Sequence, residues 1–168
     1  MNTSRLDRFH QIGELIAAVA VVISLLLVAY EVQQNSNEQQ QAMTQELITS
    51  YTDIVTLLTR DRELRCAYIK GIQDYHSLNG EEALAVGAYL IALMRHREDL
   101  YFQYLDGAVK PSIWQGFDRG TRIAMQRPGW QQWFDFRRDW FSDEFQAYID
   151  GLMGPPMENP PKQDADCD

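Results

Sequence analysis

An apolar segment near the N-terminus, from Ile12 to Val32, constrains the fold of this chain more than any other feature. Its uncharged centre, Leu15 to Tyr30, is about 16 residues long. A helix needs roughly 20 mainly apolar residues to cross the hydrocarbon core of a bilayer, so the span must extend at both ends. No small-x-small cleavage motif follows the run where a signal peptidase would need it. We therefore expect an uncleaved transmembrane anchor over 12–32, preceded by an N-terminal arm over 1–11.

Small side chains line one face of the expected anchor. They are Gly13, Ala17, Ala20 and Ser24, spaced by four, three and four residues. Small residues at this spacing let a second helix approach closely. Two interpretations stay open: the face packs against a partner membrane protein or a second copy, or Ala and Gly are simply frequent in membrane spans.

Positive charge beside the anchor is confined to its N-terminal side. Arg5 and Arg8 precede the span, and no Lys or Arg follows it until Arg60. The positive-inside rule then places the N-terminus in the cytoplasm and the domain outside, in the periplasm of a Gram-negative cell. The net charge of the chain is −9, which repels a phosphate backbone. We expect the lipid bilayer as a partner and no nucleic acid.

The residues after the anchor predict an all-α fold. A polar stretch without an apolar stripe, 33–41, is typical of a solvated helical stalk. Helical periodicity returns at Ala42 and predicts a small bundle of about five helices over 42–153. No strand alternation or internal repeat is present. The Pro-rich, acidic segment 154–168 is expected to be a disordered tail.

Local signals set the helix boundaries inside the expected bundle. An N-cap residue or an early proline marks the start of a helix, because the first N–H groups of a helix have no partner within it. The expected helices are one capped by Asp61 and ending at Gly71, one opened by a capping box of Asn79 and Glu82 and running to about Asp106, one opened by Pro111, and a last one capped by Ser142 over 143–152.

An aromatic segment, Trp130 to Phe141, precedes the last helix. Trp130, Trp133, Phe134 and Phe141 recur at helical spacing, with Phe136 and Trp140 widening the stripe. Three interpretations stay open: a core face, a surface resting on the membrane with Arg137 and Arg138 at lipid head groups, or a docking surface for a partner protein.

Motifs of common chemistries are absent from the sequence. There is no P-loop, GxGxxG, HExxH, CxxC or GxSxG motif, and no Glu is followed by His three residues later. We therefore predict no catalytic residue, no cofactor and no metal.

The most suggestive polar cluster surrounds His96 and Asp99, which are three apart and share a helix face, with Tyr104 and Trp133 as aromatic candidates. His96 paired with a carboxylate suits a general base or a ligand. The alternative is a histidine hydrogen-bonded in or beside the core.

The two cysteines are Cys66, in an apolar helical stretch, and Cys167, the penultimate residue of the tail. Nothing in the sequence supports a disulfide between them. We expect Cys66 to be a buried structural thiol, and the cysteines do not fix the compartment.

Four weak motifs occur in order along the chain: GELIAAVAVVISLLLVAYEVQQN, RELRCAYIKGIQDYHSLNGEE, LMRHREDLYFQYLDG and WFDFRRDWFSDEFQAYI. In this combination the chain resembles, up to about Met153, a family of small uncharacterised bacterial single-span membrane proteins with a C-terminal helical domain. The resemblance implies a protein anchored in the bacterial inner membrane and carries no established activity. Relatives tend to have a basic residue just after the span, where this chain has Val32, Gln33 and Gln34.

Together these patterns predict a membrane-anchored, non-enzymatic helical protein. Its expected role is that of an accessory or scaffolding subunit, a protein-interaction module of a membrane assembly. The alternative is a tethered ligand-binding or sensor domain, with a small apolar molecule held between the aromatic helices around His96, Tyr101, Tyr104 and Trp133.

Overall fold

The structure is a computed structural model that describes residues 3–157 and 167 of the 168-residue chain. The all-α prediction is confirmed: the described residues form six α-helices and two 3₁₀ turns, with no strand among them. The elements are α1 (Thr3–Arg60), α2 (Arg62–Gln73), η1 (Tyr75–Ser77), α3 (Gly80–Leu105), α4 (Pro111–Ala124), α5 (Pro128–Arg137), η2 (Arg138–Trp140) and α6 (Asp143–Leu152). They fall into two compact units, Met1–Met43 and Thr44–Asp168.

The first unit consists of the N-terminal part of α1. This helix is the one among the described residues that is long and apolar enough to cross a membrane. Its large apolar side chains are exposed, namely those of Ile16, Val19, Val21, Val22, Ile23, Leu25, Leu26, Leu27, Val28, Tyr30 and Val32. The small residues Gly13, Ala17, Ala20 and Ser24 are exposed as well. An isolated helix that is apolar on all sides is unfavourable in water and suits a bilayer.

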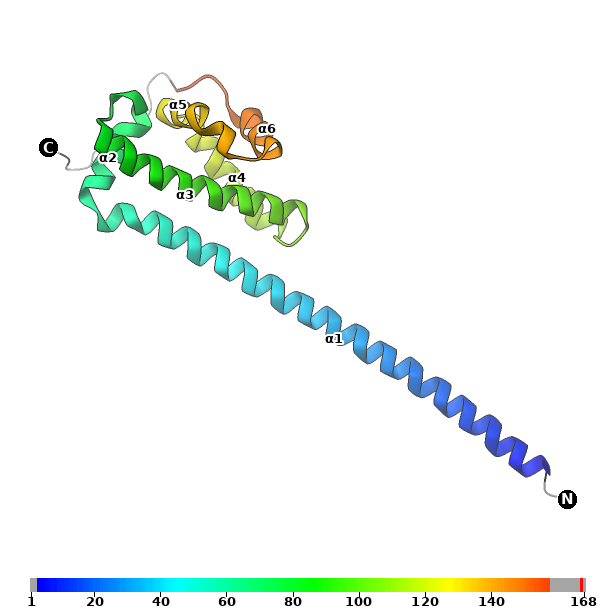
Figure 1. Cartoon of the computed structure of the whole chain (residues 1–168). Helices are drawn as coiled ribbons and strands as arrows, with labels where there is room; N and C mark the ends of the chain where they lie inside the picture. The colour runs from blue at the N-terminus through cyan, green and yellow to red at the C-terminus, as the bar shows by residue number, and fades with distance from the viewer. Residues whose placement is uncertain (1–2, 158–166, 168) are drawn as a thin grey trace. The chain divides into compact units, whose positions relative to one another are not determined.

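The second unit is a helical domain built around α3. This helix packs against both α2 and α4, and α2 also packs against α5 (Figure 1). The buried core draws on α2, α3, α5 and α6 and on residues in the connections that precede α5 and α6. Its members are Ala67, Ile72, Val86, Tyr89, Leu90, Leu93, Met94, Met125, Trp130, Trp133, Phe134, Phe141, Phe145, Ile149 and Leu152.

The predicted caps are confirmed. Asn79 accepts hydrogen bonds from the backbone N–H groups of Glu81 and Glu82, and the Glu82 carboxylate accepts one from the Asn79 N–H, which completes the capping box. Asp61 and Ser142 cap α2 and α6. These contacts are local, so the sequence alone predicted them.

One boundary was predicted wrongly. Gly71 does not end α2, which continues to Gln73. Gly71 is buried within the helix, and a Cβ there would lie 2.9 Å from the Leu78 side chain, so this glycine serves close packing and does not mark the helix end.

The aromatic segment divides into buried and exposed parts. Trp130, Trp133, Phe134 and Phe141 are buried, as a core stripe requires. Phe136 and Trp140 do not extend that stripe: they are 67% and 48% exposed. Phe136 belongs to α5 and lies on its exposed side, whereas Trp140 belongs to the 3₁₀ turn that follows, where the period of 3.6 residues no longer holds.

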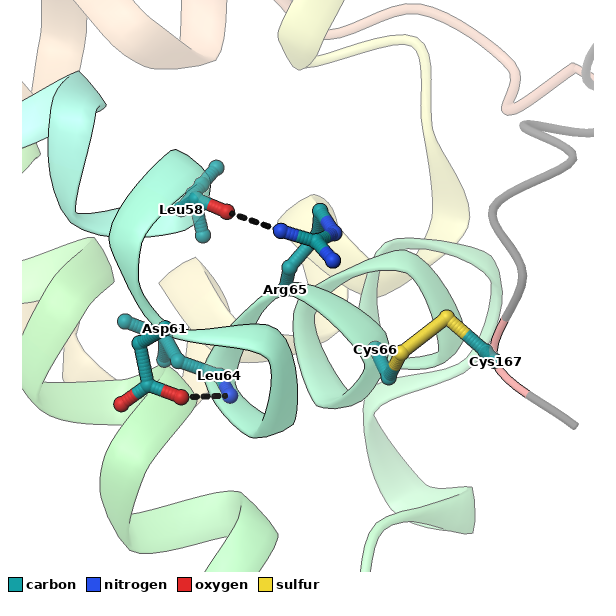
Figure 2. The surroundings of a disulfide bond; sticks show 6 residues. All are labelled: Leu58, Asp61, Leu64, Arg65, Cys66 and Cys167. Carbon is teal, nitrogen blue, oxygen red and sulfur yellow. Dashed lines mark hydrogen bonds between the residues drawn. A yellow bond between two sulfur atoms is a disulfide. The ribbon is translucent and has the colours of Figure 1, made fainter.

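The prediction of a free, buried Cys66 thiol is wrong. Cys66 is half-buried on α2 and forms a disulfide with Cys167, 101 residues further along the chain (Figure 2). The start of the predicted tail is also attached: the Met157 N–H donates to the Gln126 carbonyl. The rest of the tail prediction, over 158–166 and at 168, lies outside the described residues.

Candidate ligand-binding site

His96, the centre of the predicted polar cluster, is buried on α3. Its ring stacks on that of Tyr51 from the C-terminal part of α1, with 5.7 Å between centroids, and lies 6.0 Å from the ring of Phe117 on α4. Burial lowers the pKa of His96 below its ordinary value; Asp99 opposes this shift and Arg97 adds to it. His96 is therefore a neutral ring among other rings.

The other three predicted residues do not converge with His96 on one cavity. Asp99 is exposed and accepts a hydrogen bond of 2.8 Å from Gln103 on its own helix. The ring of Tyr104 stacks on that of Trp114, with 4.9 Å between centroids. Trp133 is fully buried among other aromatic rings. None of the four lines either of the two cavities described next.

A cavity of about 330 Å³ lies within the helical domain, and we call it the Arg97 cavity. Five helices contribute to its wall. The lining residues are Tyr51, Val55 and Leu58 of α1, Tyr68 and Ile72 of α2, Tyr89, Leu93 and Arg97 of α3, Gly120, Ile123 and Ala124 of α4, Arg127 between α4 and α5, and Trp130 of α5. The wall is thus mostly apolar and aromatic with two arginines, and no acidic residue is among these lining residues.

Arg97 is the unusual member of this wall. The residue is only 8% exposed, and its Nε and Nη1 atoms are buried without a hydrogen-bond partner in the described part of the chain. Its guanidinium carbon lies 5.2 Å from the centroid of the Trp130 ring, close enough for a cation–π contact. Burial lowers the pKa of Arg97, although arginine keeps its proton in proteins. Arg97 therefore places a charged group, two of whose nitrogens are sealed off without a partner among the described residues, in a largely apolar wall.

The carboxylate next to Arg97 in sequence is committed elsewhere. Glu98 lies 2.6 Å from Arg95 through its Oε2 atom. Its Oε1 atom accepts hydrogen bonds from the backbone N–H and the hydroxyl of Ser142, at 2.8 and 2.9 Å. Glu98 thus holds the start of α6 against α3 and does not neutralise Arg97.

Tyrosines supply the remaining polar groups of the cavity. Burial raises the pKa of Tyr68 and of Tyr89, so both hydroxyls are protonated at neutral pH. Their rings pack edge to face, 5.3 Å apart. A neutral hydroxyl both donates and accepts hydrogen bonds, so the cavity offers a cation, neutral hydroxyls and aromatic faces to a guest.

A second cavity, of about 500 Å³, lies beside the disulfide. Charged side chains of both signs line it, among them Lys70 and Glu82, which pair with each other at 2.8 Å. Because Lys70 and Glu82 already neutralise each other's charge, the second cavity is the weaker candidate for a ligand-binding site.

The sequence patterns pointed to His96 and not to its neighbour Arg97. A signal was present, because Leu90, Leu93, Met94 and Leu100 lie seven, four and three residues before Arg97 and three after it. Those spacings place Arg97 on the apolar face of the helix. Burying an arginine on such a face costs free energy unless its charge has a partner. An arginine at this spacing therefore marks a candidate functional position.

The geometry defines a class of site: a small, mainly apolar cavity with a few convergent polar groups, as small-molecule sites have. Among the described residues no group of His, Cys, Asp or Glu is arranged to hold a metal ion. Comparison of the chain with protein-family models, with curated proteins and with solved structures finds no match. The interpretation of the site therefore rests on its own chemistry.

Proposed function

We propose that this protein is a membrane-tethered domain that binds a small molecule in the Arg97 cavity and acts as a receptor or sensor at a membrane surface. The observation that carries the proposal is the buried charge of Arg97 in the cavity wall, where no acidic side chain is among the lining residues. The cavity volume lies at the small end of the range of roughly 300–1,000 Å³ typical of ligand pockets. Of the two roles considered from sequence, this geometry favours ligand binding, in a different cavity from the one expected.

The proposed location is the bacterial inner membrane, with the domain on the periplasmic side. The exposed apolar surface of α1 supports a membrane anchor. The disulfide between Cys66 and Cys167 supports an oxidising compartment for the domain, because cytosolic thiols are kept reduced. Arg5 and Arg8 before the anchor favour the same orientation.

Two glycines on α4 give a matched test of ligand binding. Gly120 lines the Arg97 cavity and Gly116 does not. A Cβ at either position meets no atom within 4 Å, apart from neighbours along the helix. Both therefore tolerate a larger side chain, and only a leucine at position 120 occupies space at the cavity.

The measurement is native mass spectrometry of the full-length protein in mild detergent. We expect the wild type and Gly116→Leu to carry a bound small molecule as a mass shift, and Gly120→Leu to lose it. A wild type without any adduct, or an adduct that persists in Gly120→Leu, contradicts the proposed function.

A second candidate function is that of an accessory subunit of a membrane assembly. A surface cluster favours it: Phe136 and Trp140 are exposed, and the guanidinium carbon of Arg137 lies 4.5 Å from the centroid of each ring. Arginine and aromatic side chains are enriched where proteins bind each other. In the same spectra a partner or second copy would appear as a larger complex, which Ala20→Leu should weaken if the anchor contributes to it.

A further inference from the structure

We infer that the ligand of the Arg97 cavity is a small monocarboxylic acid with an apolar body. This inference rests on the proposed function and names the class of molecule that the same cavity accepts. It follows from three observations: the buried charge of Arg97, the commitment of the nearby acids, and the composition and size of the cavity.

The buried charge of Arg97 calls for a counter-charge. A buried guanidinium without an anion is unfavourable, because it has lost its hydration and gained no opposite charge in return. Nε and Nη1 of Arg97 are both buried and have no partner in the described part of the chain. An anionic group in the cavity would lie beside this guanidinium and neutralise its charge.

Neither Glu98 nor Asp99, the acidic residues that follow Arg97 in the sequence, supplies that anion. Glu98 is bound to Arg95 and to Ser142. Asp99 accepts from Gln103 on the exposed side of α3. The residues that line the cavity contain no carboxylate. The counter-charge of Arg97 is therefore expected to come from a molecule that enters the cavity.

The rest of the cavity wall favours a ligand with an apolar body. Aliphatic and aromatic side chains form most of the wall, including Val55, Leu58, Leu93 and Trp130. An apolar body gains free energy by leaving water for such a wall. The hydroxyls of Tyr68 and Tyr89 are neutral donors that suit the second oxygen of a carboxylate.

Size and charge narrow the class further. A volume of about 330 Å³ is at the small end of ligand pockets, so the cavity suits a small molecule and not a two-chain phospholipid. A carboxylate carries one negative charge, whereas a phosphate monoester carries about −1.5 to −2 at neutral pH. Of the two arginines in the wall, Arg97 is the one with buried nitrogens that lack a partner among the described residues, and its single charge matches a carboxylate.

The test compares acids with their neutral primary amides, which have nearly the same size. The probes are 3-phenylpropanoate and octanoate, each paired with its amide and titrated into the full-length protein in a nonionic detergent. Trp130 lines the cavity, so tryptophan fluorescence reports binding. We expect the wild type to bind at least one acid about 10- to 100-fold more tightly than its amide.

Arg97→Met separates the charge from the cavity. This variant should bind the amide as the wild type does and lose the preference for the acid. It should also unfold at a higher temperature than the unliganded wild type, because replacing an unpaired buried charge with an apolar side chain of similar length removes its desolvation cost. Arg97→Lys keeps a positive charge and serves as a second variant if Arg97→Met does not fold.

The outcomes separate this inference from the proposed function. Equal affinity of the wild type for acid and amide, or a preference that persists in Arg97→Met, overturns the carboxylate assignment and leaves ligand binding intact. Failure of both acids to bind also overturns the carboxylate assignment. The proposed function is decided independently, by whether the adduct seen in mass spectra is kept in Gly116→Leu and lost in Gly120→Leu. Tighter binding of phenyl phosphate than of either acid would replace the carboxylate with a phosphate ligand.

Discussion

Adjacent residues on α3 illustrate how one turn of a helix separates different environments. His96 lies among the rings of Tyr51 and Phe117, whereas Arg97 faces a cavity and Glu98 holds the start of α6. All three are buried. Their contrasting roles depend both on their own chemistry and on what approaches each of them from α1, α4 and α6.

The lowered pKa of His96 predicts a pH dependence of stability. Between the folded-state pKa and the ordinary value of about 6.5, the unfolded chain binds the proton and the folded chain does not. The free energy of unfolding should therefore fall as pH decreases through this window, with a slope of at most about 1.4 kcal/mol per pH unit from this one group.

His96→Phe keeps a ring between Tyr51 and Phe117 and removes the titration. Its stability should depend less on pH than that of the wild type between about pH 7.5 and 5.5. Unfolding followed by tryptophan fluorescence measures the difference, because all four tryptophans lie within the domain. Replacement of the exposed His76 by Gln serves as the control. Equal slopes for wild type and His96→Phe would show that His96 does not titrate differently on folding.

At the scale of elements, the contact between α2 and α5 is set by glycine. A Cβ on Gly129 would lie 1.8 Å from the carbonyl oxygen of Gly71 and 2.8 Å from the carbonyl carbons of Gly71 and Ile72. These are backbone atoms, so no side-chain rotation relieves the overlap. The two helices approach as closely as they do only because position 129 carries no side chain.

We predict that Gly129→Ala destabilises the domain by about 3 kcal/mol or more, because α5 must move away from α2 and the core around Trp130 opens. Gly116→Ala is the matched control, since a Cβ there meets no atom within 4 Å outside its own helix neighbourhood. That control should be stabilising by roughly 0.5–1 kcal/mol through helix propensity. Chemical unfolding of both variants gives the comparison, and a Gly129→Ala variant as stable as the wild type would contradict the predicted overlap.

Helix caps could be predicted from this sequence, whereas contacts between residues far apart in the chain could not. Asn79, Glu82 and Ser142 act on backbone groups within three residues, so their pattern is readable along the chain. Burial of Arg97 and the pairing of Cys66 with a residue 101 positions away depend on which helices meet. Helical periodicity marks the buried face of α3, but it does not show that a cavity opens there.

At the scale of the whole molecule, the disulfide closes most of the domain into one loop. Cross-linking residues about 100 apart reduces the entropy of the unfolded chain, and native disulfides typically contribute about 2–4 kcal/mol. Cys66→Ser and Cys167→Ser should therefore each lower the free energy of unfolding by about that amount, and the double variant should lose no more than either single one.

Unfolding of the wild type with and without reductant measures the same contribution of the disulfide to the free energy of unfolding. Reduction should lower the stability of the wild type to that of the serine variants. The stability of the serine variants should not change on reduction. Labelling of the unfolded, unreduced protein with a thiol reagent should modify neither cysteine. Full labelling of both cysteines in protein isolated from its membrane would contradict the disulfide and remove its support for an oxidising compartment.

The same link bears on how this domain responds to proteases. The connections between α3, α4, α5 and α6 all lie between Cys66 and Cys167. A single cut in any of these connections leaves two fragments that stay covalently joined through the disulfide. Such nicked molecules separate on a gel only after reduction, and the domain keeps all of its residues until a second cut or the loss of this bond.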